Sequence, residues 1–111
     1  WKDAAAFPLC LLTRNMFNRR IIDEAFATAN AVPNIVMETD ALTASLVQLT
    51  NGSAGTIPTE QLAESNSVAV DILRLRLVDP VVTNPDGLIV SDREPVLPAV
   101  RALLKVVAQA A

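Results

Sequence analysis

The chain has 111 residues, of which 51% are hydrophobic and 19% charged, and its formal net charge is −3. This size and composition predict a single globular domain with a modest core, and the net negative charge without a basic cluster argues against nucleic-acid binding by this stretch of chain. The single cysteine and the lack of histidine exclude an internal disulfide, a zinc site and a Ser-His-Asp or Cys-His catalytic site.

The apolar runs are short. None approaches the ~18 residues that predict a membrane span, and no charged and then apolar signal opens the chain. We therefore expect a cytoplasmic protein that makes no contact with a membrane.

The first predicted elements are a strand and a helix. Residues 8–12 are a short apolar run typical of a buried strand, and residues 17–30 have the spacing of an amphipathic helix. The helix should end before Pro33, because the residue before a proline disfavours the helical conformation. The inward positions are Ile22, Phe26 and Ala29, and the outward ones are Arg19, Arg20, Asp23 and Glu24.

A second strand and helix are expected next. Residues 34–39 predict a strand, and Asp40 is a candidate N-cap for the helix that follows. Asn51 and Gly52 predict the end of that helix. Its expected inward residues are Leu42, Leu46, Val47 and Leu49.

The same alternation then repeats with shorter segments. Residues 54–57 predict a third strand, Thr59 is expected to cap a short helix that runs to Glu64, and residues 68–73 predict a fourth strand. Strands that alternate with helices are typical of an α/β fold, so we expect a mostly parallel sheet flanked by helices.

The pattern changes after residue 75. Turn signals at residues 79–80 and 84–87 precede an expected strand over residues 87–91. Pro95 and Pro98 then introduce a last helix, whose apolar stripe is Leu97, Val100, Leu103, Leu104 and Val107. We therefore divide the chain into residues 1–84 and residues 85–111.

Candidate site residues follow three of the predicted strands. Parallel strands end at the same edge of a sheet, which is where open α/β folds bind ligands, so these residues predict a small polar pocket. A capping role for Thr13 or Asn15 in the first helix is the simpler alternative. The candidates are Thr13, Arg14, Asn15, Thr39, Thr56, Ile57 and Pro58.

Other candidates have structural explanations. Cys10 lies between leucines in a strand and is expected to be a buried small hydrophobe. Residues 51–55 are rich in glycine but precede a strand and lack the lysine of a phosphate-binding loop. No paired carboxylates support acid–base catalysis, and no metal or cofactor is expected, so an enzyme is disfavoured.

The order of motifs resembles the effector-binding domain of LysR-type transcriptional regulators. Residues 3–9, DAAAFPL, are similar to the family's opening DLAxxPL motif, and residues 13–15 resemble its polar effector loop. Residues 38–42, together with Gly52, resemble the family's next motif, ExxxxxxxxxVxxG. Ile57-Pro58 resembles the LP that follows this motif in the family. Residues 87–90 resemble the family's closing strand, and residues 93–95 resemble the turn before its C-terminal helix.

This resemblance implies a fold like one half of a type-II periplasmic binding protein, with residues 1–84 as the second subdomain and residues 85–111 as the crossover strand and C-terminal helix. It implies a ligand-sensing domain that holds a small anionic effector in a cleft and controls DNA binding by a separate helix-turn-helix domain. The helix that begins near Asn15 would point its N–H groups at the effector. The alternative is a solute-binding protein of a transport system, which would need a secretory signal.

The resemblance also implies an assembly. The strand that would complete this half of the fold is expected before Trp1, so the sheet should keep a free edge. We expect residues 87–110 either to fold back onto their own sheet or to exchange with a second copy in a symmetric dimer, with residues 84–87 as the hinge.

Overall fold

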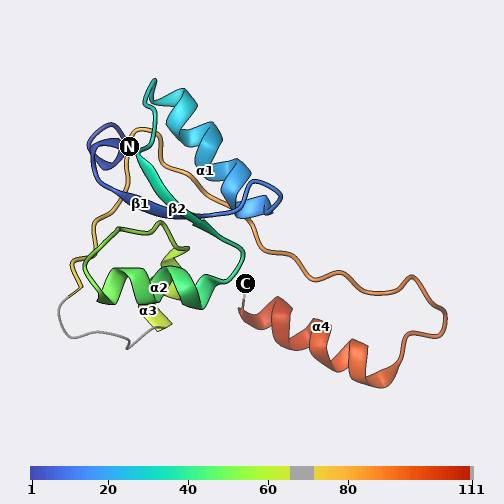
Figure 1. The fold of residues 1–111 in the computed structure, drawn as a ribbon. Coiled ribbons are helices and arrows are strands. Elements are labelled where there is room, and N and C mark those ends of the chain that lie inside the picture. The colour runs from blue at the N-terminus through green and yellow to red at the C-terminus, as the bar shows by residue number, and fades with distance from the viewer. Residues whose placement is uncertain (66–71, 111) are drawn as a thin grey trace.

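The computed structural model describes residues 1–65 and 72–110. Its elements run in chain order from a short 3₁₀ helix to a C-terminal α-helix (Figure 1). They are η1 (Ala4–Ala6), β1 (Leu9–Leu12), α1 (Phe17–Thr28), β2 (Ile35–Thr39), α2 (Leu42–Thr50), α3 (Glu60–Ser65) and α4 (Pro98–Ala110). The described residues form both strands and helices, which confirms the expected α/β class.

The sheet is smaller than expected. It contains two parallel strands, β1 and β2, with Leu9 opposite Ile35 and Cys10 opposite Met37. The register shift between these pairs leaves Val36 as the extra residue. The predicted third strand over residues 54–57 is reduced to one parallel bridge, between Gly55 and Leu9.

β1 lies in the middle of this arrangement. Leu9 donates its N–H to Asn34 on the β2 side at 2.9 Å, and Cys10 donates to Gly55 on the other side at 2.8 Å. The outer edge of β2 pairs with no strand in the described part of the chain. Helices α1 and α2 lie on opposite sides of the sheet (Figure 1).

The core lies between β1, α1 and the N-terminus. Trp1 contacts Phe26 edge to face, with ring centroids 5.0 Å apart, and its Nε1 donates to the carbonyl of Pro80 at 2.8 Å. This bond fastens the start of the extended C-terminal segment to the core. The buried cluster is Trp1, Leu9, Leu11, Ile22, Ala25, Phe26 and Ala29.

Helix α1 begins without a side-chain cap. Its N-cap is Met16, whose N–H donates to the carbonyl of Thr13 at 3.0 Å, so neither Thr13 nor Asn15 caps the helix with its side chain. At the other end Ala29 is the C-cap and Asn30 has φ 52°, so the helix ends before Pro33 as predicted.

Helix α2 begins one residue later than predicted. The N-cap is Ala41 rather than Asp40, because the Thr39 hydroxyl accepts the Ala41 N–H at 3.1 Å and forms the turn. Asn51 is the C-cap, and Gly52 follows with φ 69°, as the sequence predicted. Thr59 also fulfils its expected role, since its Oγ1 accepts the Leu62 N–H of α3 at 3.4 Å.

The expected inward face of α2 is wrong in part. Ser45 is the helix's buried residue, whereas Leu42 and Val47 are exposed. The two-stranded sheet is too narrow to cover both flanks of the helix, so part of its apolar surface faces solvent.

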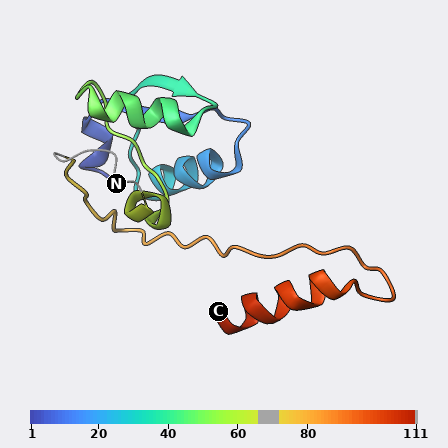
Figure 2. The same cartoon turned by 90° about the horizontal axis from the view of Figure 1, so that it is seen from below.

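The C-terminal part differs most from expectation. Residues 87–91 form no strand, and α4 buries no residue even though it has the predicted apolar stripe. The expected packing of residues 87–110 onto their own sheet is therefore wrong. Figure 2 shows α4 apart from the sheet, at the end of an extended segment. Residues 68–71 of the fourth predicted strand lie outside the described residues, and residues 72–73 form no strand.

Candidate functional site

The carboxyl edge of the sheet is formed by the ends of β1 and β2. Thr13 donates its N–H to the carbonyl of Thr39 at 3.0 Å, one step beyond the last strand pair, Leu12 with Thr39. The structure therefore brings Thr13 and Thr39 together where the sequence placed them. Arg14 and Asn15 follow in the exposed turn that leads into α1.

The two threonine hydroxyls at this edge differ. The hydroxyl of Thr39 accepts the Ala41 N–H in the turn before α2. The Oγ1 of Thr13 is buried and has no hydrogen-bond partner in the described part of the chain. An unpaired buried polar group is unfavourable, and this hydroxyl is also closed off from the surface, so it is an unsatisfied group of the interior.

The third candidate segment is only loosely attached to the edge. Gly55 pairs with Leu9 at the opposite end of β1, and Thr56, Ile57 and Pro58 continue from there in the parallel direction. Ile57 packs against the hydrophobic core. No hydrogen bond between described residues joins these three residues to Thr13 or Thr39.

Arg19 is buried, which corrects its predicted outward position. Its side chain is 1% exposed and links three elements. Nε donates to Asp23 of α1 at 2.8 Å, and Nη1 donates to the carbonyl of Leu12 at 2.7 Å and to Glu38 of β2 at 2.8 Å. Asp23 is therefore not a free outward side chain either.

These contacts keep Arg19 charged. Burial by itself lowers the pKa of the guanidinium, but the hydrogen bonds and charges of Asp23 and Glu38 more than compensate, so the pKa is raised. The two carboxylates remain about 42% and 40% exposed. The result is a charged cluster with its cation inside and its anions at the surface.

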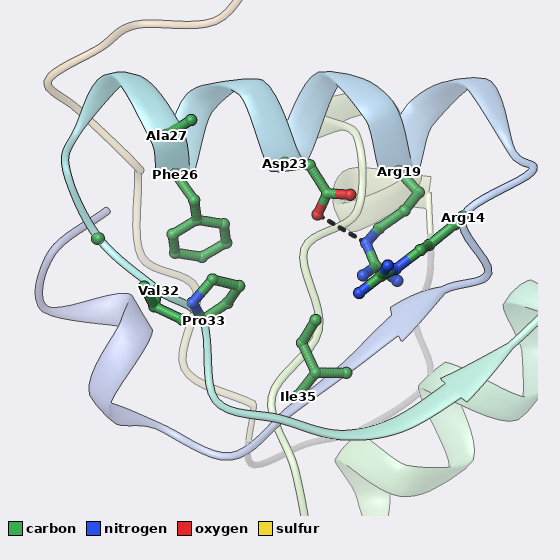
Figure 3. A pocket seen from close by; sticks show the side chains of 9 residues that line it. Arg14, Arg19, Asp23, Phe26, Ala27, Val32, Pro33 and Ile35 are labelled. Atoms are coloured by element: carbon green, nitrogen blue, oxygen red, sulfur yellow. Dashed lines mark hydrogen bonds and ion pairs between the residues drawn. The ribbon is translucent and has the colours of Figure 1, made fainter.

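A pocket of about 570 Å³ opens beside this cluster, between α1 and the segment that leads into β2. Figure 3 shows the Arg14 and Arg19 side chains directed into it, with the Phe26 ring and Pro33 at the other end. Its lining is Arg14, Arg19, Asp23, Phe26, Ala27, Ala31, Val32, Pro33 and Ile35.

The two arginines of the pocket differ in their partners. Arg19 is paired with two carboxylates. Arg14 is exposed and makes no ion pair or hydrogen bond with any described residue. Arg14 is therefore the cation that can bind an anion in this pocket.

Sequence reasoning found part of this site. Arg14 lines the pocket, whereas Thr13, Asn15 and Thr39 lie at the neighbouring sheet edge. Arg19 and the apolar wall were missed. The spacing of Arg19 and Asp23, four residues apart on one helix, was the available signal for an ion pair.

Cys10 takes no part in this chemistry. Its side chain is fully buried, and burial raises the pKa of the thiol, which confirms the prediction of a small buried hydrophobe. Within residues 1–65 and 72–110, no group of three or more histidine, cysteine or acidic side chains could hold a metal ion. None of the described helices is both long and apolar enough to span a bilayer.

Comparison of the chain with protein-family models, with curated proteins and with solved structures found no match.

Proposed function

We propose that this chain is a ligand-sensing domain that binds a small carboxylate at the pocket beside Arg14. The observation that carries the proposal is a guanidinium without a partner, aimed into a pocket whose far wall is apolar. Small-molecule sites commonly combine an apolar lining with a few polar groups that orient the ligand.

The two ends of the pocket suit the two ends of such a ligand. The Arg14 guanidinium can donate two parallel hydrogen bonds to a carboxylate. An apolar ligand body would lie against Phe26, Val32 and Pro33. Arg19 is already neutralised by Asp23 and Glu38, so its role is to hold α1 against the sheet.

The resemblance to LysR-type regulators supplies the biological context of this proposal. The chain would sense its effector in the cytoplasm, as part of a homo-oligomer, and reach DNA only through a separate helix-turn-helix domain. The bound effector would favour one arrangement of the assembly over another. The chain itself would bind its ligand without transforming it.

Titration with phenylacetate, followed by amide chemical shifts, tests the binding site. We expect saturable shifts at residues 13–15 and 26–35, and no such binding by the uncharged phenylacetamide. Arg14→Gln should weaken phenylacetate binding by at least about tenfold, because it removes a charge-assisted hydrogen bond.

The control is Arg20→Gln, which removes an equal charge from α1 at a residue that stacks on Phe17 instead of lining the pocket. It should leave phenylacetate binding unchanged. Equal binding of phenylacetate and phenylacetamide, or equal effects of the two substitutions, would contradict the proposal.

A further inference from the structure

Asp23 lines the same pocket as Arg14 and brings a negative charge to it. Its Oδ1 accepts a hydrogen bond from Nε of Arg19 at 2.8 Å, whereas its Oδ2 accepts none from any described residue. The side chain is 42% exposed, so a bound molecule can reach this second oxygen. A carboxylate oxygen accepts a strong hydrogen bond from an ammonium group. The pocket therefore offers a site for a cation next to its site for an anion.

The charges beside the pocket also favour a ligand with both signs of charge. Arg19 carries one positive charge and is paired with two carboxylates, those of Asp23 and Glu38. This cluster therefore keeps one excess negative charge, and the unpaired guanidinium of Arg14 supplies a positive charge at the same pocket. A ligand with one negative and one positive group complements this arrangement, whereas a simple carboxylate is repelled by the excess negative charge.

Helix α1 sets the order of the groups along the pocket. Arg19, Asp23 and Phe26 follow one another at spacings of four and three residues, which places them on one face of the helix. Along the helix axis, Asp23 lies about 6 Å from Arg19 and about 4.5 Å from Phe26. Figure 3 shows Asp23 between the Phe26 ring and the guanidinium groups of the two arginines. The pocket therefore presents, in order, positive charge, negative charge and an apolar wall.

We propose that the ligand of this pocket is a zwitterionic α-amino acid with an apolar side chain. Its carboxylate binds Arg14, and its ammonium group donates to Oδ2 of Asp23. Its side chain lies against the apolar wall that begins at Phe26. An α-amino acid carries these three groups on one carbon atom, and the pocket of about 570 Å³ has room for it. This inference rests on the proposed carboxylate site and adds the class of ligand.

Ligands that lack one of the three groups fit the pocket less well. A simple carboxylate leaves Oδ2 of Asp23 without a donor. An amine without a carboxylate leaves the Arg14 guanidinium unpaired. A small amino acid without an apolar side chain leaves the wall at Phe26, Val32 and Pro33 uncovered. Each of these losses predicts weaker binding than that of an apolar amino acid.

Titration of the full chain with L-phenylalanine and with 3-phenylpropionate, followed by amide chemical shifts, tests the inference. The two ligands differ only in the ammonium group. We expect L-phenylalanine to bind at least about fivefold more tightly, because the ammonium group adds a charge-assisted hydrogen bond and offsets the repulsion of the carboxylate. Phenethylamine, which is phenylalanine without its carboxylate, should bind more weakly than L-phenylalanine.

Asp23→Asn removes the charge of Asp23 and keeps an amide oxygen that can accept the Arg19 Nε–H. We expect this variant to lose the preference for L-phenylalanine, while its binding of 3-phenylpropionate stays equal or becomes tighter. Retained binding of 3-phenylpropionate shows that the pocket is intact. The matched control is Glu24→Gln, which removes an equal charge from the next residue of α1, an exposed residue that does not line the pocket. It should keep the preference.

The outcomes separate this inference from the proposed function. Equal affinities of the unsubstituted protein for L-phenylalanine and 3-phenylpropionate would overturn the inference and leave the carboxylate site standing. A preference that survives Asp23→Asn, or that Glu24→Gln also removes, would overturn the role of Asp23. If neither ligand nor phenylacetate binds, the carboxylate site itself is wrong. The comparison of ligands in the unsubstituted protein decides the inference even if Asp23→Asn fails to fold, which circular dichroism would show.

Discussion

At the scale of single residues, the most informative side chain is Arg19. It lies on α1, bonds to the end of β1 through the Leu12 carbonyl, and bonds to β2 through Glu38. A buried ion pair is costly to form, because both partners lose water. Here only the cation is buried, and its carboxylates keep contact with solvent. The cost of burial therefore falls mainly on the arginine.

This asymmetry leads to a prediction for the free energy of unfolding. The double substitution Asp23→Ala with Glu38→Ala leaves a buried guanidinium without a counter-charge, and we expect a loss of about 3–5 kcal/mol. Arg19→Met should cost only about 1–3 kcal/mol, because the carboxylates regain water and the Leu12 carbonyl loses one hydrogen bond. Urea unfolding of the variants at pH 7 measures both values.

Arg20→Met is the control, since Arg20 is exposed on the same helix. It should change the free energy of unfolding by no more than about 0.5 kcal/mol. An Arg19→Met variant less stable than the double carboxylate variant would contradict this account of the cluster.

At the scale of elements, single residues set three helix ends: the C-termini of α1 and α2 and the N-terminus of α3. Asn30 and Gly52 both adopt positive φ just beyond the C-caps of α1 and α2. Gly52 donates its N–H to the Leu49 carbonyl at 3.1 Å, which closes the last turn of α2. Thr59 supplies the side-chain oxygen at the start of α3.

Gly52→Ala is expected to destabilise the protein by about 1 kcal/mol, because an L residue with a Cβ is strained at φ 69°. The space around the glycine is open, so the effect should come from the backbone conformation and not from a clash. Thermal unfolding followed by circular dichroism measures it.

Gly87→Ala provides a matched control. Its surroundings are equally open, and its φ is not in the left-handed region. We expect no destabilisation there. Equal losses at both glycines would show that positive φ is not the cause.

At the scale of the whole molecule, stability depends on one small core. The buried cluster joins Trp1 near the N-terminus to β1 and to α1, and Leu77 packs against it from the extended segment. Phe26 is the central side chain, since it is 1% exposed and contacts the Trp1 ring. Loss of Phe26 therefore affects contacts along most of the folded body.

Phe26→Ala should lower the free energy of unfolding by about 3–5 kcal/mol, a large fraction of the total of about 5–15 kcal/mol typical of such domains. The emission of Trp1 should shift to the red as its ring loses cover. Phe17→Ala, at a ring that is 60% exposed, should cost less than about 1 kcal/mol. Urea unfolding followed by tryptophan fluorescence measures both variants, and similar losses would contradict a core centred on Phe26.

The sequence by itself determined the local elements. The apolar runs identified β1 and β2, the periodicity of apolar residues identified α1, α2 and α4, and Gly52 and Thr59 marked helix ends. These signals act over a few residues and are set by backbone preference and side-chain spacing. The proximity of Thr13 and Thr39 also followed, because parallel strands end at one edge.

Only the tertiary structure decided which apolar and charged side chains are covered. Arg19 is buried because Leu12 and Glu38, from two other elements, provide its partners, and these elements meet α1 only in the folded chain. The stripes of α2 and α4 have the pattern of buried helices, yet Val47 and Leu104 are exposed. A periodic pattern specifies which side of a helix is apolar. Whether that side is covered depends on the surface that reaches it, and in the single chain the narrow sheet covers α2 only in part and α4 not at all.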